Sequence, residues 1–179
     1  MSEERRLWAP WRNAYIRMKK SQRCIFCIGT RAGDRKMRVI ARGEHAFSML
    51  NKYPYNCGHV MVAPYRHAGD IALLTDDELS DMMRLLVETK RLLDRTLKPH
   101  AYNIGMNLGK IAGAGFDAHV HIHIVPRWAS DTNFMPVVAD TRVLSDSLDA
   151  LYERLKKEAK KARRFGAGSS EFGVSRLNA

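Results

Sequence analysis

The stretch His119-Val120-His121-Ile122-His123-Ile124-Val125-Pro126-Arg127-Trp128 alternates histidine with β-branched residues, which is the pattern of a strand. Side chains on a strand repeat every two residues, so His119, His121 and His123 share one face and the apolar residues between them point into the core. With a rise of about 3.3 Å per residue, the backbones of the first and third histidines lie roughly 13 Å apart. Because one ion cannot comfortably bind all three at that separation, we expect the histidines to have different roles.

Three alternating imidazoles admit three interpretations: metal ligands, a nucleophile with its partners, or a polar strand that is rich in histidine. A lone histidine is most often a neutral ring satisfied by a hydrogen bond, whereas three before Arg127 and Trp128 favour a functional site. A nucleophilic histidine needs one neutral nitrogen aimed at phosphorus and the other nitrogen held by an acceptor. His121 is the best candidate because His119 and His123 flank it, and His123 can then donate to a phosphate oxygen.

The length and composition of the chain favour one well-buried domain with appendages. The chain has 179 residues, of which 45% are hydrophobic, and no run approaches the roughly 20 apolar residues that span a bilayer. Its first residues, Met-Ser-Glu-Glu-Arg-Arg, lack the apolar stretch of a secretory signal. We therefore expect a cytoplasmic protein with no membrane partner.

The formal net charge of +11 is concentrated at the two ends of the chain. Residues 1–38 and 153–179 together carry +13, whereas residues 39–152 carry −2. This distribution indicates basic arms on a near-neutral body and not a uniformly basic nucleic-acid domain. The arms are able to attract polyphosphate or RNA, but solvated surface charge explains them at least as well, and the core indicates no nucleic-acid partner.

The three cysteines, Cys24, Cys27 and Cys57, show no sign of a secreted disulfide framework. The Cys24-Ile-Phe-Cys27 pair is half a zinc site, a redox pair or a coincidence, and the spacing alone does not choose among these. A redox pair normally opens a helix after a strand in a βαβ pattern, which is not visible here. Cys57 has no evident partner and is expected to be a small buried hydrophobe.

Hydrophobic alternation predicts an antiparallel meander of short strands at 38–41, 45–50 and 59–63. A polar, glycine-containing loop is predicted before it, over residues 29–38. Residues 102–109 predict a further strand that is broken by glycines, and a glycine inside a strand often marks the close approach of a ligand or another backbone. The later glycines at 113–115 can offer backbone N–H groups to a phosphate, although a flexible loop explains them equally well.

Two helices are predicted, one central and one near the end of the chain. Thr75 and Glu78 form a capping-box pattern that begins an amphipathic helix, which runs to about Leu97. The second helix is capped near Ser145 and runs to about residue 164. From Gly166 the composition predicts a flexible tail.

The His-x-His-x-His stretch followed by two apolar residues resembles the signature of the histidine triad superfamily of nucleotide hydrolases and transferases. Four further stretches resemble its bacterial diadenosine tetraphosphate phosphorylase branch: residues 7–12, 112–115, 126–128 and 131–134. Hydrolases of the superfamily often carry a Ser or Gln shortly before the triad, and residues 113–117 lack both, which also favours the phosphorylase-like branch. The resemblance covers about residues 7–145.

The resemblance implies an α+β fold, in which an antiparallel sheet of about five strands packs against a long helix. We expect a basic, tryptophan-containing arm over residues 1–23, the histidine triad domain over 24–145, a C-terminal helix over 146–165 and a tail over 166–179. It also implies a homodimer that shares the strand and helix around residues 76–109.

The resemblance further implies the chemistry of the site. The protein would cleave dinucleoside polyphosphates, such as diadenosine tetraphosphate, through a nucleotidyl intermediate on His121 that phosphate or water resolves. The implied substrate-binding residues are Asn107, Gly113, Gly115, His123 and Arg127. A structural zinc ion is implied, with two thiolates and two imidazoles as ligands: Cys24, Cys27, His67 and His119.

The amino-acid sequence leaves two other functions open. The chain is also consistent with a nucleotide- or RNA-binding regulator that has the same site but little turnover, and an acid-labile nucleotide adduct on the protein would distinguish the enzyme from it. A redox protein centred on Cys24 and Cys27 predicts a thiol–disulfide transition and no bound zinc, so metal analysis separates it from the zinc protein.

Overall fold

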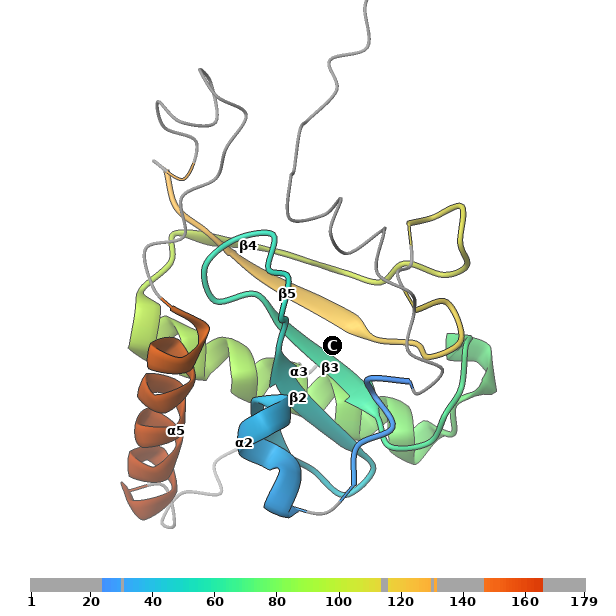
Figure 1. The fold of residues 1–179 in the computed structure, drawn as a ribbon, viewed down its shortest axis with the longest axis horizontal. Helices are drawn as coiled ribbons and strands as arrows, with labels where there is room; N and C mark the ends of the chain where they lie inside the picture. Colours follow the sequence, from blue (N-terminus) through green and yellow to red (C-terminus); the bar gives the residue numbers. More distant parts are fainter. Residues whose placement is uncertain (1–23, 30, 114–115, 130, 132–146, 166–179) are drawn as a thin grey trace, which may run out of the picture.

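A five-stranded antiparallel sheet forms the centre of the fold (Figure 1). The computed structural model describes residues 24–29, 31–113, 116–129, 131 and 147–165. The strands are β1 (Val39–Arg42), β2 (Ala46–Leu50), β3 (Val60–Pro64), β4 (Ala101–Gly105) and β5 (Ile122–Arg127), in the spatial order β1-β2-β3-β5-β4. All neighbouring strands are antiparallel, which confirms the expected α+β class and number of strands.

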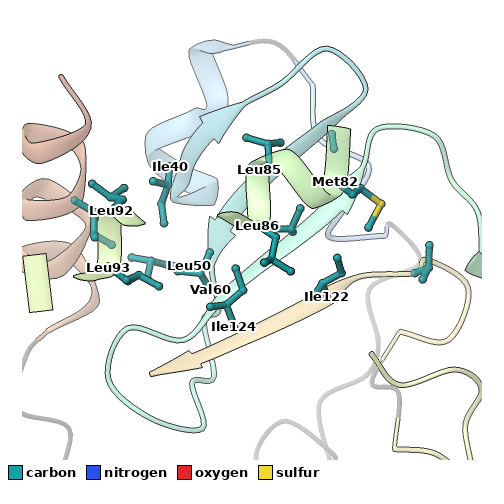
Figure 2. Close-up of a cluster of buried hydrophobic side chains, with 14 of the residues drawn as sticks. Ile40, Leu50, Val60, Met82, Leu85, Leu86, Leu92, Leu93, Ile122 and Ile124 are labelled. Carbon is teal, nitrogen blue, oxygen red and sulfur yellow. The ribbon is translucent and has the colours of Figure 1, made fainter. Parts of the chain in front are cut away.

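Helix α3 (Asp76–Leu97) lies across one face of the sheet, and α5 (Leu148–Phe165) packs beside it (Figure 1). Alternate residues of the strands meet the apolar side of α3, and Figure 2 shows Leu86 of α3 gathered with Val60 and Ile122 in this core. Val120, Ile122 and Ile124 belong to this core, as the alternating pattern predicts. The opposite residues of the strands form a second, smaller cluster with Phe26: Val39, Phe47, Met49, Met61 and Ala63.

The beginning and end of α3 follow from its sequence. The Thr75 side chain accepts a hydrogen bond from the Glu78 backbone, and the Glu78 carboxylate accepts one from the Thr75 N–H, so the predicted capping box is present. Arg66 holds the same carboxylate with two charge-assisted hydrogen bonds of 2.8 and 2.6 Å. The helix ends where Lys98 adopts a left-handed conformation, with φ of 48°, before Pro99.

Helix α5 covers the outer edge of the sheet at β1. Its side chains Leu151, Tyr152 and Leu155 are buried in the main core. Lys156 donates through Nζ to the carbonyl oxygen of Ile40 over 3.2 Å, and Asp149 accepts from Arg38 over 2.8 Å. An edge strand presents unpaired backbone groups, so α5 protects β1 from pairing with other strands.

The structure corrects two predictions about local structure. Residues 29–38 are not a simple loop, because they contain the turn η1 (Arg31–Gly33) and the short helix α2 (Asp34–Met37). The predicted strand also begins later than His119: the ladder of β5 starts at Ile122. The reason is that the Val120 N–H bonds to the carbonyl oxygen of Ala68, over 2.7 Å, in the segment after β3 and not in a neighbouring strand.

Several predicted features lie outside the described residues. These are the arm over residues 1–23, Gly115, the cap near Ser145 and the tail over 166–179. Directly before α5, the Ser147 side chain accepts a hydrogen bond from the Ala150 N–H over 3.2 Å, in the manner of an N-cap. Among the described residues, no helix is both long enough and apolar enough to cross a membrane.

Candidate functional site

The three histidines of the triad lead into β5 from the loop that precedes it, on the face of the sheet that carries Phe26. His119 is fully buried, His121 is 6% exposed and His123 is partly buried. The ring centroids of His121 and His123 are 4.7 Å apart and the rings are nearly perpendicular. The structure therefore brings His121 and His123 together. His119 has different neighbours and a different role.

His119 joins the two cysteines and His67 in a cluster of four potential metal ligands. One ligand atom from each of Cys24, Cys27, His67 and His119 lies within 4.8 Å of all the others. The measured separations are 3.4 Å for Cys24 Sγ to His119 Nδ1, 3.2 Å for Cys27 Sγ to His67 Nδ1 and 4.0 Å for Cys27 Sγ to His119 Nδ1. Two thiolates and two imidazoles are a donor set that tetrahedral zinc accepts, and these ligand atoms are close enough together for the four residues to be candidates for holding one ion.

The second nitrogen of His119 also fits metal binding. Nε2 lies 3.0 Å from the carbonyl oxygen of Pro64, which can only accept, so Nε2 carries the proton. Nδ1 then keeps its lone pair and points at the cysteines. A histidine ligand held in this way by a backbone carbonyl is common in metal sites.

A similar argument fixes the tautomer of His121. Its Nδ1 lies 2.9 Å from the carbonyl oxygen of His119 and therefore donates to it. The free lone pair of the ring is then on Nε2. Burial lowers the pKa of His121, an effect that the hydrogen bond to His119 partly opposes, so the ring is neutral near pH 7. A neutral imidazole with one nitrogen held by an acceptor is the state that a nucleophile requires.

A fourth histidine, His59, fixes the tautomer of His123. The Tyr55 N–H donates to His59 Nδ1 over 3.1 Å, so the proton of the neutral His59 ring is on Nε2. His59 Nε2 donates to His123 Nδ1 over 2.9 Å. His123 consequently carries its proton on Nε2, where it can donate to an oxygen of a bound substrate.

Both rings of this pair are neutral at physiological pH. Burial, and then the charges of His123 and His121, lower the pKa of His59 to about 3. Burial, and then His121, lower the pKa of His123 to about 4. His59 was not among the site residues predicted from the sequence. The sequence does show that His59, Met61 and Ala63 are alternate residues of a predicted strand and so share one face. It does not show which strand lies next to that one.

The structure places two more predicted residues close to each other. Gly113 has φ of 88°, and a side chain added there would approach Asn107 Nδ2 to 3.9 Å. Gly105 pairs with His123 across the β4–β5 ladder. Asn107 and His121 lie just outside this ladder, because β4 ends at Gly105 and β5 begins at Ile122.

Arg127 lies at the far end of β5 from the histidines. Its guanidinium donates to both carboxylate oxygens of Asp131, over 2.5 and 3.0 Å, and to Asn103 Oδ1 over 2.9 Å. A substrate phosphate at Arg127 would therefore compete with the carboxylate of Asp131 for the same cation.

Comparison with known proteins identifies the family. The family model for the HIT domain matches residues 32–129, more than half of the chain. This chain belongs to the HIT domain family. The AP-4-A phosphorylase of Mycobacterium tuberculosis is 35% identical to it over 152 residues, which cover 80% of this chain and 78% of that protein. This similarity agrees with the resemblance to the diadenosine tetraphosphate phosphorylase branch.

Solved structures share the HIT fold. One is a hypothetical histidine triad nucleotide-binding protein, ST2152, from Sulfolobus tokodaii, with a TM-score of 0.63 and 21% identity over 84% of this chain and 100% of that chain. Another is a Zn-bound histidine triad family protein from Mycobacterium smegmatis, with a TM-score of 0.61 and 22% identity over 79% of this chain and 96% of that chain. At these identities the likeness shows a common fold.

Proposed function

We propose that this HIT protein is a nucleotidyl transferase or hydrolase that cleaves dinucleoside polyphosphates, such as diadenosine tetraphosphate, through a covalent intermediate on His121. The observation that carries the proposal is the protonation state of the site: His121 has a free Nε2, whereas His123 offers a donor on Nε2. A nucleophile therefore lies next to a hydrogen-bond donor. Nucleophilic attack on a phosphate group requires both of these groups. The similarity to AP-4-A phosphorylase supports the substrate class.

In the proposed first step, His121 Nε2 attacks the α-phosphorus of one nucleotide. The N–P bond forms as the bridging P–O bond breaks, and diadenosine tetraphosphate would release ATP and leave AMP on the histidine. In the second step, an oxygen of phosphate or water attacks the same phosphorus, which breaks the N–P bond and releases ADP or AMP. The proton stays on His121 Nδ1 and is hydrogen-bonded to the His119 carbonyl throughout, so the positive charge that develops on the ring is partly offset.

The remaining residues bind and orient the substrate in this proposal. His123 donates to a non-bridging oxygen, where charge develops in the transition state. Asn107 and Gly113 line the reacting phosphate, and the same role is proposed for Gly115, which lies outside the described residues. Arg127 meets a second phosphate with the donors that Asp131 and Asn103 leave. Cys24, Cys27, His67 and His119 would hold zinc. When bound, the ion would cross-link the segments before β1, after β3 and before β5, and it would take part in no chemical step.

A homodimer is the proposed assembly. Four large apolar side chains on α3 and around β4 are 39–52% exposed: Met83, Val87, Ile104 and Leu108. β4 is also an edge strand of the sheet. An apolar helix surface beside an unpaired edge is a surface that a second copy can cover. Sedimentation of the wild type and of a Met83→Glu variant tests this assembly. A charge buried in the interface would shift the variant toward monomer. A wild-type protein that already sediments as a monomer would contradict the assembly.

The decisive experiment is incubation with diadenosine tetraphosphate, with and without inorganic phosphate, followed by identification of the products. ATP with ADP indicates phosphorolysis, and ATP with AMP indicates hydrolysis. An acid-labile adenylyl adduct is expected on the wild-type protein and not on a His121→Asn variant. His45→Asn is the matched control, because the His45 side chain is 40% exposed and lies as far as 3.9 Å from its ion-pair partner Glu44. Full turnover by His121→Asn would refute the proposed nucleophile.

A further inference from the structure

Phe26 lies between two metal-ligand cysteines and directly against His121. Its side chain is 1% exposed. The centroid of its ring is 4.4 Å from that of His121, and the planes of the two rings are inclined by 28°, which is a stacked arrangement. The same ring lies 5.2 Å from that of His119. One aromatic side chain from the metal-binding loop therefore touches both a metal ligand and the proposed nucleophile.

The contacts of His121 show why this matters for its orientation. The hydrogen bond from Nδ1 to the His119 carbonyl fixes one atom of the ring. A single hydrogen bond leaves the ring free to tilt around that atom, and a tilt moves Nε2 away from the line of attack. Phe26 supports one face of the ring and the perpendicular His123 ring lies 4.7 Å away, so the plane of His121 is defined.

The position of Phe26 depends in turn on the metal-binding loop. The Cys27 N–H donates to the Cys24 carbonyl over 3.3 Å, so the loop is a tight turn, and the Ile28 N–H donates to the Phe26 carbonyl over 2.8 Å. Cys24 and Cys27 reach His119 and His67 on either side of Phe26. Binding of zinc by these four residues therefore also fixes the ring between the two cysteines.

We propose that Phe26 is a positioning residue for the nucleophile, through which the zinc-binding loop sets the plane of the His121 ring. The inference rests on the proposed function, because it assumes that His121 attacks phosphorus. Misplacement of a reacting group by about 1 Å can lower a rate by about 100-fold. Loss of the Phe26 ring should therefore reduce kcat while the zinc content and the affinity for substrate are retained.

The test compares Phe26→Leu with Phe47→Leu. Phe47 is a matched control, because it is also fully buried in the same small cluster but stacks on Tyr65 and not on a histidine of the site. For Phe26→Leu we expect a fall in kcat of about 10- to 100-fold with little change in KM, and one zinc per chain. For Phe47→Leu we expect a kcat close to that of the wild type. Equal kcat values for the two variants would overturn the proposal.

A second measurement does not depend on activity. In NMR spectra of the zinc-bound wild-type protein, stacking on Phe26 should shift the ring protons of His121 upfield and give nuclear Overhauser contacts between the two rings. Phe26→Leu should remove the upfield shift, whereas Phe47→Leu should retain it. Absence of the contacts in the wild type would overturn the inference even if Phe26→Leu does not fold.

The two measurements also separate the inference from the proposed function. If His121→Asn keeps full turnover, the nucleophile is wrong, whatever the effect of Phe26→Leu on the spectrum. If His121→Asn is inactive and Phe26→Leu is as active as Phe47→Leu, the nucleophile stands and the positioning role is wrong.

Discussion

His59 donates from Nε2 to Nδ1 of His123 over 2.9 Å, and this hydrogen bond determines which nitrogen of His123 carries the proton. The bond connects β5 to the residue just before β3, so a strand neighbour that is 64 positions away in the chain sets the state of a site residue. Tyr55 adds a stacked ring at a centroid distance of 4.8 Å from His59. The ring of His59 is thus held from two sides before it holds His123.

We predict that His59→Phe lowers kcat by about 10- to 100-fold, because His123 loses the donor that fixes its tautomer. His59→Gln should recover part of the loss, since the amide nitrogen of Gln can stand near the position of Nε2 and donate. The measurements are kcat, KM and the nitrogen chemical shifts of the His123 ring. Equal activity of the Phe and Gln variants would show that the hydrogen bond does not matter and that only the volume of the ring does.

Acid should destabilise the protein at a pH at which most carboxylates are still ionised. The pKa values of His59 and His123 in the folded protein are about 3 and about 4, below the ordinary value of 6.5. The unfolded chain therefore binds more protons between pH 6.5 and 4, so stability falls as the pH is lowered through that range. Roughly 1–2 kcal/mol should be lost for each histidine by pH 5.

Urea unfolding at pH 7.5, 6.5, 5.5 and 5.0 measures this loss. The pKa of Glu78 is lowered to about 2, chiefly by the hydrogen bonds from Arg66, so its contribution is lost only below its ordinary value of 4.5. A His123→Gln variant keeps all four potential zinc ligands and should show a flatter dependence on pH. The same slope in wild type and variant would mean that another group is responsible.

Zinc binding gives a third prediction, in which two cysteines of this chain are compared. Cys24→Ser should lose bound zinc and about 4 kcal/mol or more of unfolding free energy, because a ligand of a structural site is removed. Cys57→Ser should retain one zinc per chain, since Cys57 packs at the border of the main core and lies outside the ligand cluster. Metal analysis by mass spectrometry and thermal unfolding with and without a chelator check both variants.

The sequence predicted the parts of this fold and site that depend on short-range periodicity. Alternation of histidine with aliphatic residues was enough to place Val120 and Ile122 in the core, and the Thr75–Glu78 pattern located the beginning of α3. Helix α2 was not predicted because its four residues are too few to show a period. The late start of β5 depends on one long-range hydrogen bond, from Val120 to Ala68, which no local pattern encodes.

The candidate site also combines features that could be predicted from the sequence with features that depend on long-range contacts. The four potential metal ligands were inferred from resemblance, and the structure brings their side chains together. The tautomers of His119 and His123 were not predictable, because they are set by the Pro64 carbonyl and by the His59 ring, 55 and 64 positions away in the chain. His59 lies beside His123 because β3 pairs with β5. The local sequence of a strand does not predict which strand it pairs with.

The contact between Gly43 and Asp81 gives a last prediction, on stability. The Asp81 carboxylate accepts from the backbone N–H groups of His45 and Ala46, over 2.7 and 2.9 Å, and so holds the beginning of β2 against α3. A Cβ atom at Gly43 would come within 2.6 Å of Asp81 Oδ1, so Gly43→Ala must displace a buried carboxylate and should cost about 1–3 kcal/mol. Gly33→Ala is the matched control, because nothing lies within 4 Å of a Cβ there and its φ of −85° suits alanine. Urea unfolding should give a lower midpoint for Gly43→Ala only, and equal midpoints for the two variants would show that α3 yields to the added methyl group at little cost.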